Sequence, residues 1–231
     1  MKADVILLPG LHGSRALFSS FVALAPAWAN CLPLALPTVG GQSFDELSDV
    51  IFQELKSLEG FVLLGESFSG PVAARLSARL GEKVALLVLC NPVIEMSVRV
   101  PEGILASIAA SAWMPAWGAS MALSGGDMSI ARAALDEVRA LPKGILAQRL
   151  SAVYSATEED LASRLTPPLL TILGTNDGLV SPSRSRAFFS RVPDSTLARI
   201  SSIWEMKIGS RAPAMKMLRK PAVLAPSSFT V

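Results

Sequence analysis

Ser67 lies in a short turn whose residue types suit nucleophilic chemistry. The stretch at residues 61–70, FVLLGESFSG, has the pattern of an apolar strand, a turn of small residues and the start of a helix. A serine at such a turn has a strained backbone and an exposed hydroxyl, and the amide of the next residue, Phe68, points toward a developing oxyanion. The pattern therefore predicts Ser67 as the nucleophile of an acyl transfer, with Phe68 as an amide donor. The alternative is an ordinary serine in a glycine-rich turn.

The residues around Ser67 resemble the nucleophile elbow of the α/β-hydrolase fold, whose pattern is Gly-x-Ser-x-Gly. Gly65 and Ser67 match this pattern, whereas Ser69 stands at its last glycine and Gly70 follows one residue later. Serine is small enough for that position. The resemblance implies a catalytic triad whose members follow in the order serine, acid and histidine along the chain.

A second stretch, LLPGLHGS at residues 7–14, is similar to the family's His-Gly-x-x-Gly-Ser loop. In the family this loop follows the first strand and supplies the second oxyanion amide. Matching Gly10 and Gly13 to the two glycines implies this role for the backbone amide of Leu11. A rival alignment, which takes the loop's own histidine and Gly13 as the His-Gly pair, moves the role to Ser14. Leu11 is favoured because the Pro-Gly pair follows the strand at once.

The stretch GTNDGLVSP at residues 174–182 resembles the family's Gly-x-x-Asp-x-x-Val loop, in which the aspartate orients the catalytic histidine. The resemblance implies this role for Asp177. The alternative is that Asp177 only caps a turn, as Asn-Asp-Gly sequences often do. The order of the two motifs, Ser67 and then Asp177, is the order that this fold requires.

The triad histidine that the resemblance implies is missing from its expected place. It should follow a last strand, for which residues 195–200 are the candidate, but residues 201–231 contain no histidine. Either this tail is a natural, divergent ending or a frameshift near Ile200 has replaced the original one. The chain's one histidine, His12, belongs to the oxyanion side of the site, while the acid comes from the other side. We therefore expect His12, like Ser14, to line the pocket mouth, with a role as general base as the alternative.

The elements that hold these residues follow the pattern of a parallel sheet covered by helices, because short apolar runs alternate with segments of helical spacing. Helices are predicted from residue 43, where Ser43 and Glu46 form a capping-box pattern, and over residues 69–80. Nearly continuous apolar runs predict strands buried on both faces, at residues 5–8, 32–36, 61–64, 84–90 and 169–173. The predicted fold class is α/β, with a mostly parallel sheet and helices on both faces.

A helical insertion is predicted between two strands of this sheet, because about 70 residues there lack a strand pattern. The expected division is an α/β-hydrolase core at residues 1–91 and 165–200, a cap insertion at 92–164 and a divergent, disordered or frame-shifted tail at 201–231. The cap is expected to place Trp113 and Trp117 in an apolar acyl pocket. The alternative is that both side chains simply pack the cap on the sheet.

The composition of the 231-residue chain excludes several classes of site and partner. Apolar residues make up 51% and charged residues 17%, which favours a compact fold, and the net charge of +2 gives no reason to expect nucleic acid. Cys31, Cys90 and one histidine form no zinc-binding pattern, so we expect neither metal nor cofactor. Residues 103–126 carry no charge, but proline, glycine and serine interrupt them, and we expect no membrane span. The first residues lack a signal-peptide pattern, so a cytoplasmic location is expected.

Among α/β-hydrolases, the chain is similar to small bacterial carboxylesterase-type serine hydrolases. This resemblance implies that Ser67 attacks a small apolar carboxylic ester or thioester. Without the triad histidine such an enzyme would be impaired. The alternatives are a non-catalytic protein that binds an acyl ligand in the same pocket, and a truncated product without a stable fold.

Overall fold

The sheet is the centre of the molecule. The computed structural model describes residues 2–93, 128–155, 161–174, 191–192 and 194–200. Within them, six strands form one sheet in the order β2-β1-β3-β4-β5-β6, and every neighbouring pair is parallel. The strands are β1 (Ala3–Leu8), β2 (Ala29–Pro33), β3 (Phe61–Glu66), β4 (Val84–Cys90), β5 (Leu169–Gly174) and β6 (Ser195–Ile200).

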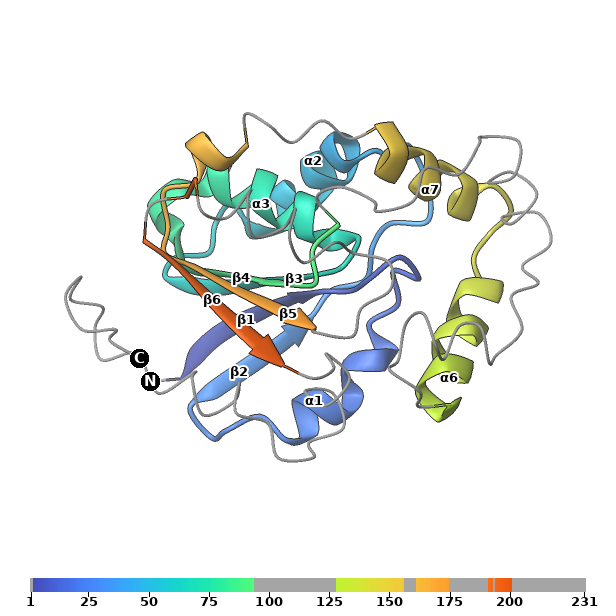
Figure 1. The fold of residues 1–231 in the computed structure, drawn as a ribbon, viewed down its shortest axis with the longest axis horizontal. Helices are drawn as coiled ribbons and strands as arrows, with labels where there is room; N and C mark the ends of the chain where they lie inside the picture. The colour runs from blue at the N-terminus through green and yellow to red at the C-terminus, as the bar shows by residue number, and fades with distance from the viewer. Residues whose placement is uncertain (1, 94–127, 156–160, 175–190, 193, 201–231) are drawn as a thin grey trace.

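Helices lie on both faces of the sheet, as predicted. The helices are α1 (Ser19–Ala23), α2 (Phe44–Leu55), α3 (Ser69–Leu80), α6 (Met128–Arg139) and α7 (Ile145–Ser155), with 3₁₀ turns at Ala16–Phe18, Gly81–Lys83 and Ala162–Arg164. Figure 1 shows α2 and α3 on one face and α1 on the opposite face. The α/β class predicted from the sequence is thereby confirmed.

The helix α2 begins at the predicted capping box. The Oγ of Ser43 accepts a hydrogen bond from the Glu46 amide at 3.2 Å, and the Glu46 carboxylate accepts one from the Ser43 amide at 3.1 Å. Two amide groups that the first helical turn leaves without intrahelical partners are satisfied in this way. The prediction for this helix start is confirmed.

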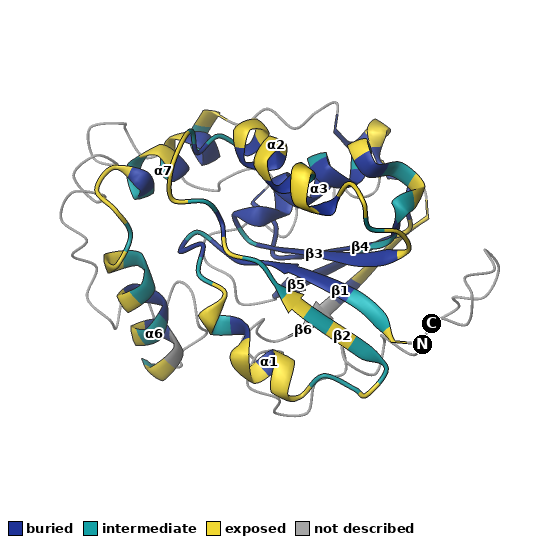
Figure 2. Ribbon diagram, turned by 180° about the vertical axis from the view of Figure 1, so that it is seen from behind, coloured by how far each residue is buried: buried dark blue, intermediate teal, exposed yellow. Residues whose placement is uncertain are grey.

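The core has two layers, one on each face of the sheet. Successive side chains of a strand point to opposite faces. In β1, Ile6 and Leu8 therefore pack in the cluster under α2 and α3, while Val5 and Leu7 pack in the cluster that includes Phe18. Figure 2 shows the central strands as largely buried. Burial on both faces explains why these strands have continuous apolar runs in the sequence.

The strand at the edge of the sheet departs from the prediction. The sequence predicts a strand at residues 32–36, whereas β2 occupies Ala29–Pro33. As an edge strand, β2 pairs only with β1, and its residues alternate between half-buried and exposed. The apolar run at residues 32–36 therefore overlaps only the last two residues of β2 and continues beyond its end. The other predicted strands, including the one at Ser195–Ile200, are confirmed.

Between β4 and β5, the described residues form α6, α7 and one 3₁₀ turn. The proposed division into core, cap and tail includes many residues outside the described ranges and stays a prediction. In the part of the chain that the structure describes, no helix is long and apolar enough to cross a membrane. The uncharged segment at residues 103–126 lies outside that part.

Candidate active site

The carboxyl ends of β1 and β3 form the point where the strand order of the sheet reverses. The chain runs from β1 outward to β2 and then returns to β3 on the other side of β1. The two central strands end at the same level, because Leu8 pairs with Gly65. In an open α/β sheet, ligands bind in the crevice that forms beyond the strand ends at such a point. Both loops singled out from the sequence, residues 9–14 and the turn at Ser67, begin here.

The backbone of Ser67 is strained. Its φ is +48°, in the left-handed region that non-glycine residues seldom adopt. Three hydrogen bonds hold it there: its amide donates to the Cys90 carbonyl at 2.8 Å, and its carbonyl accepts from the amides of Gly70 at 3.0 Å and Val93 at 3.1 Å. The side chain is half-buried. The structure therefore has the strained strand-to-helix turn that the sequence predicts.

Two glycines allow β3 and α3 to meet at this turn. A Cβ atom on Gly65 would lie 2.6 Å from the Ser69 carbonyl oxygen and 2.6 Å from the Cβ of Ala73. A Cβ atom on Gly70 would lie 2.4 Å from the Cβ of Pro92. Real Cβ atoms do not approach so closely, so the close contacts require glycine at residues 65 and 70. The motif has its second obligatory glycine one residue later than the usual pattern.

Ser69 makes a contact that glycine could not make. It is fully buried at the first turn of α3, and its Oγ donates a short hydrogen bond to the Pro9 carbonyl. This bond joins the start of α3 to the loop that follows β1. The departure from the Gly-x-Ser-x-Gly pattern thus ties together the two loops of the crevice.

Ser69→Ala is expected to lower the free energy of unfolding by about 1–2 kcal/mol, because the buried Pro9 carbonyl loses its partner. Ser77→Ala is the matched control. Ser77 is equally buried in the same helix, but its hydroxyl has no partner among the described residues. Removing that hydroxyl should leave the stability unchanged or raise it slightly. Urea unfolding of both variants gives the comparison, and equal losses would contradict the role of the Ser69 bond.

The loop after β1 is a tight turn with two amides to compare. The Gly13 amide donates to the Gly10 carbonyl at 2.9 Å. The Ser14 amide donates to Nδ1 of His12 at 3.0 Å, so it is engaged within the loop. Within the described residues, neither the Leu11 amide nor the Phe68 amide donates to an acceptor. This geometry favours Leu11 over Ser14 as a donor to a bound oxyanion.

A family model described as serine aminopeptidase, S33, matches residues 42–204, which is more than half of the chain. The chain belongs to this Hydrolase_4 family. The family lies within the α/β-hydrolase superfamily that the motifs indicate. No curated protein sequence gives a significant match to the chain.

Solved structures similar to this Hydrolase_4 chain share its fold at low sequence identity. A hydrolase from Oleispira antarctica has a TM-score of 0.77 at 13% identity, covering 87% of this chain and 84% of its own. An enol-lactonase from Burkholderia xenovorans has a TM-score of 0.72 at 18% identity, covering 87% and 83%. A thermophilic esterase from Thermogutta terrifontis has a TM-score of 0.72 at 16% identity, covering 91% and 86%.

His12 of the Hydrolase_4 chain lies in the loop that follows β1, near Gly10. The imidazole is buried, and its Nδ1 lone pair accepts the Ser14 amide. A Cβ atom placed on Gly10 would lie 3.7 Å from Nε2 of His12 and 3.8 Å from Cδ of Glu66. Nε2 of His12 and the Glu66 carboxyl carbon therefore both lie within 4 Å of the position that a side chain at residue 10 would occupy. Because Nδ1 of His12 already accepts the Ser14 amide, Nδ1 does not accept the Ser67 proton in this conformation.

Sequence reasoning missed Asn91, which lies directly after β4. Its φ is +42°, its amide donates to the Ile172 carbonyl at 2.9 Å, and its side-chain oxygen accepts from the Gly174 amide at 2.7 Å. Asn91 thus fixes the end of β5, from which the chain continues toward Asp177. The signal was available, because asparagine tolerates positive φ and Asn91 directly follows the apolar run at residues 84–90. Asp177 itself, Trp113 and Trp117 lie outside the described residues.

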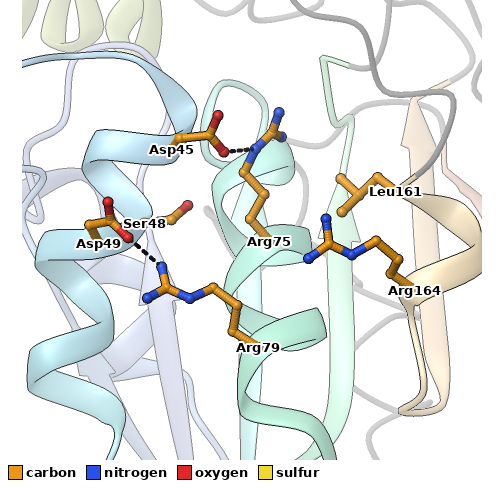
Figure 3. Close-up of a pocket in the computed structure, with 7 residues that line it drawn as sticks. All are labelled: Asp45, Ser48, Asp49, Arg75, Arg79, Leu161 and Arg164. Carbon is orange, nitrogen blue, oxygen red and sulfur yellow. Dashed lines mark hydrogen bonds and ion pairs between the residues drawn. The ribbon is translucent and has the colours of Figure 1, made fainter.

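A separate hollow of about 230 Å³ lies over α2 and α3 (Figure 3). Ion pairs cross it, from Arg75 to Asp45 at 2.7 Å and from Arg79 to Asp49 at 2.6 Å. Both aspartates are largely exposed, so each pair contributes at most about 1 kcal/mol. None of the residues that line the hollow belongs to the crevice. They are Asp45, Ser48, Asp49, Arg75, Arg79, Leu161 and Arg164. Among the described residues, no group of three metal-binding side chains occurs anywhere.

Proposed function

We propose that this Hydrolase_4 protein is a serine hydrolase that cleaves a carboxylic ester or thioester by acyl transfer to Ser67. The observation that carries the proposal is the combination at the crevice of a strained serine with two backbone amides, those of Leu11 and Phe68, that have no acceptor among the described residues. Similar folds in an esterase and an enol-lactonase support this class of substrate.

In the proposed reaction, Oγ of Ser67 attacks the substrate carbonyl carbon and loses its proton to a base. The carbonyl oxygen becomes an oxyanion and accepts hydrogen bonds from the amides of Leu11 and Phe68. Collapse of this intermediate expels the alcohol or thiol, which takes a proton, and leaves an acyl ester on Ser67. Water then releases the carboxylic acid. Asp177 is proposed as the acid of the triad.

The proposal includes slow turnover, because the chain has a single histidine and it lies in the oxyanion loop. In another serine hydrolase, loss of the triad histidine lowers turnover about 10⁶-fold and leaves about 10³- to 10⁴-fold over water. We expect a reactive but slow serine rather than an efficient enzyme.

Labelling with a fluorophosphonate tests the proposal, because this reagent modifies an activated serine. We expect the wild-type protein to be labelled, Ser67→Ala to lose the label entirely, and Ser57→Ala, at an exposed position on the surface, to keep it. His12→Gln then shows whether His12 supplies the base. A folded wild-type protein that takes no label would contradict the catalytic proposal.

The bond between Ser14 and Nδ1 of His12 favours a second candidate function, binding of an acyl ligand without turnover. In that case the crevice keeps its shape while no base accepts the serine proton. Fatty acids should then raise the melting temperature while ester substrates remain intact. Ester turnover that disappears in Ser67→Ala would exclude this candidate.

A further inference from the structure

Arg149 is a buried charge that the proposed reaction does not yet use. It lies on α7, and its side chain is fully buried. Among the described residues it forms no ion pair with a carboxylate. Burial lowers the pKa of its guanidinium to about 10, so the group remains charged at neutral pH. A buried cation without a carboxylate partner is costly unless hydrogen bonds satisfy it.

Three oxygens from two loops satisfy this charge. Nη1 donates to the Leu11 carbonyl at 2.8 Å, Nη2 donates to the Pro37 carbonyl at 3.0 Å, and Nε donates to the side-chain oxygen of Gln42 at 2.9 Å. Gln42 is itself buried, and its side-chain nitrogen, Nε2, donates to the Gly40 carbonyl at 3.2 Å. One guanidinium therefore joins the loop after β1 to the loop that precedes α2.

The packing around the guanidinium leaves little freedom. A Cβ atom on Gly13, whose φ is +73°, would lie 2.4 Å from Nη1 of Arg149. The loop therefore lies directly on the guanidinium. The same group lies over the Phe68 ring, 5.9 Å from its centroid. Arg149 thus contacts both residues whose amides are the proposed oxyanion donors.

These contacts fix Leu11 from both sides. The turn bond from the Gly13 amide to the Gly10 carbonyl closes the loop around it, and Arg149 holds its carbonyl. The Leu11 amide shares its peptide plane with the Gly10 carbonyl, which the turn bond holds. Arg149 holds the next peptide plane through the Leu11 carbonyl. The direction of the Leu11 amide is therefore set by the turn bond, and Arg149 supports it by holding the plane that follows.

We propose that Arg149 is a positioning residue, which supports the Leu11 amide at the oxyanion site by holding the Leu11 carbonyl and the loop around it. This inference rests on the proposed function. Arg149 does not touch the reacting atoms, since its contacts among the described residues are with carbonyl oxygens, Gln42 and the Phe68 ring. Its planar fork suits several carbonyl oxygens at once, whereas a lysine ammonium is a single point charge.

The test compares Arg149→Lys and Arg149→Met with Arg139→Lys and Arg139→Met as matched controls. Arg139 is an exposed residue of α6 that pairs with Asp136 at 3.3 Å. Fluorophosphonate labelling of Ser67 is measured over a range of probe concentrations. This separates reversible binding of the probe from the rate at which the covalent bond to Ser67 forms. Hydrogen exchange of residues 9–14 and 37–42 is measured in the same proteins.

We expect Arg149→Lys to lower the rate of covalent bond formation about 100-fold with little change in probe binding, because the phosphonyl oxygen no longer meets a fixed amide. Exchange in the two loops should rise about tenfold while exchange in the sheet stays unchanged. The Arg139 variants should match the wild type. Arg149→Met should act in the same direction, and if it does not fold, Arg149→Lys carries the test.

Unchanged labelling and unchanged loop exchange in Arg149→Lys would overturn the positioning role. Faster exchange throughout the sheet would also overturn it, because the residue would then act on the whole fold. A wild-type protein that takes no label would contradict the proposed function. Loop exchange in the variants would still decide whether Arg149 positions Leu11.

Discussion

Gly65→Ala is expected to lower the free energy of unfolding by about 3 kcal/mol. The added Cβ atom would lie 2.6 Å from the Ser69 carbonyl oxygen and 2.6 Å from the Cβ of Ala73. Neither neighbour can yield by rotating a side chain, because one is backbone and the other is itself a Cβ atom. The start of α3 must therefore move away from β3. Urea unfolding followed by circular dichroism measures the loss.

Gly10→Ala is the matched control for this prediction. Gly10 is also buried at a strand end beside the crevice, but a Cβ atom there would meet its nearest neighbour, Nε2 of His12, at an ordinary 3.7 Å. The same chemical change should therefore cost less than about 1 kcal/mol. Similar losses in the two variants would show that the close approach at Gly65 is not what requires glycine.

The steric requirement at the elbow explains why the imperfect motif still marks the turn. The usual pattern has a glycine at the residue that is Ser69 here, yet the close contact with Pro92 falls on Gly70. Ser69 instead directs its hydroxyl to the Pro9 carbonyl. A sequence pattern records residue types, whereas the distance between β3 and α3 decides where glycine is obligatory.

Much of the fold could be predicted because burial on both faces leaves a strong sequence signal. Two kinds of signal depend only on neighbours in the sequence: the apolar runs of β3 and β4, and the capping box at Ser43. The predictions from both are confirmed. The sequence places the edge strand β2 at residues 32–36, three residues too late, because a strand with one partner is only half-buried and need not be continuously apolar.

The supports of the candidate site could not be predicted in the same way. Arg149 bonds to Leu11 and Gln42, which lie 138 and 107 residues earlier in the chain. No local pattern marks an arginine whose main partners are backbone carbonyls, since every residue carries a carbonyl. By contrast, Ser67 could be singled out because its surroundings are local: a strand, a turn of small residues and a helix.

Phe68→Ala is expected to lower the free energy of unfolding by about 4 kcal/mol, the largest loss among these substitutions. The side chain is 1% exposed, and its ring packs at 5.1 Å from the ring of Phe44. Removing it leaves a cavity under α2 and takes away the aromatic face beside the Arg149 guanidinium. Alanine keeps the backbone amide that is proposed to bind the oxyanion. The variant therefore removes the packing of the elbow while it keeps the proposed oxyanion donor. Unfolding in urea measures the loss of stability.

Phe52→Ala supplies the control, because Phe52 also has an arginine over its ring, with the Arg79 guanidinium 4.3 Å from the centroid. Phe52 is only half-buried on α2, so its loss should cost about 1 kcal/mol, from the cation–π contact and a modest apolar area. A difference of about 3 kcal/mol between the two variants would then be due to burial at the elbow. If Phe52→Ala is as costly as Phe68→Ala, the stability of this region comes from the arginine contacts rather than from the packed core. In that case the elbow is held mainly by charges on α3 and α7, and its stability should fall with added salt. The stability of a packed aromatic core should not fall with added salt.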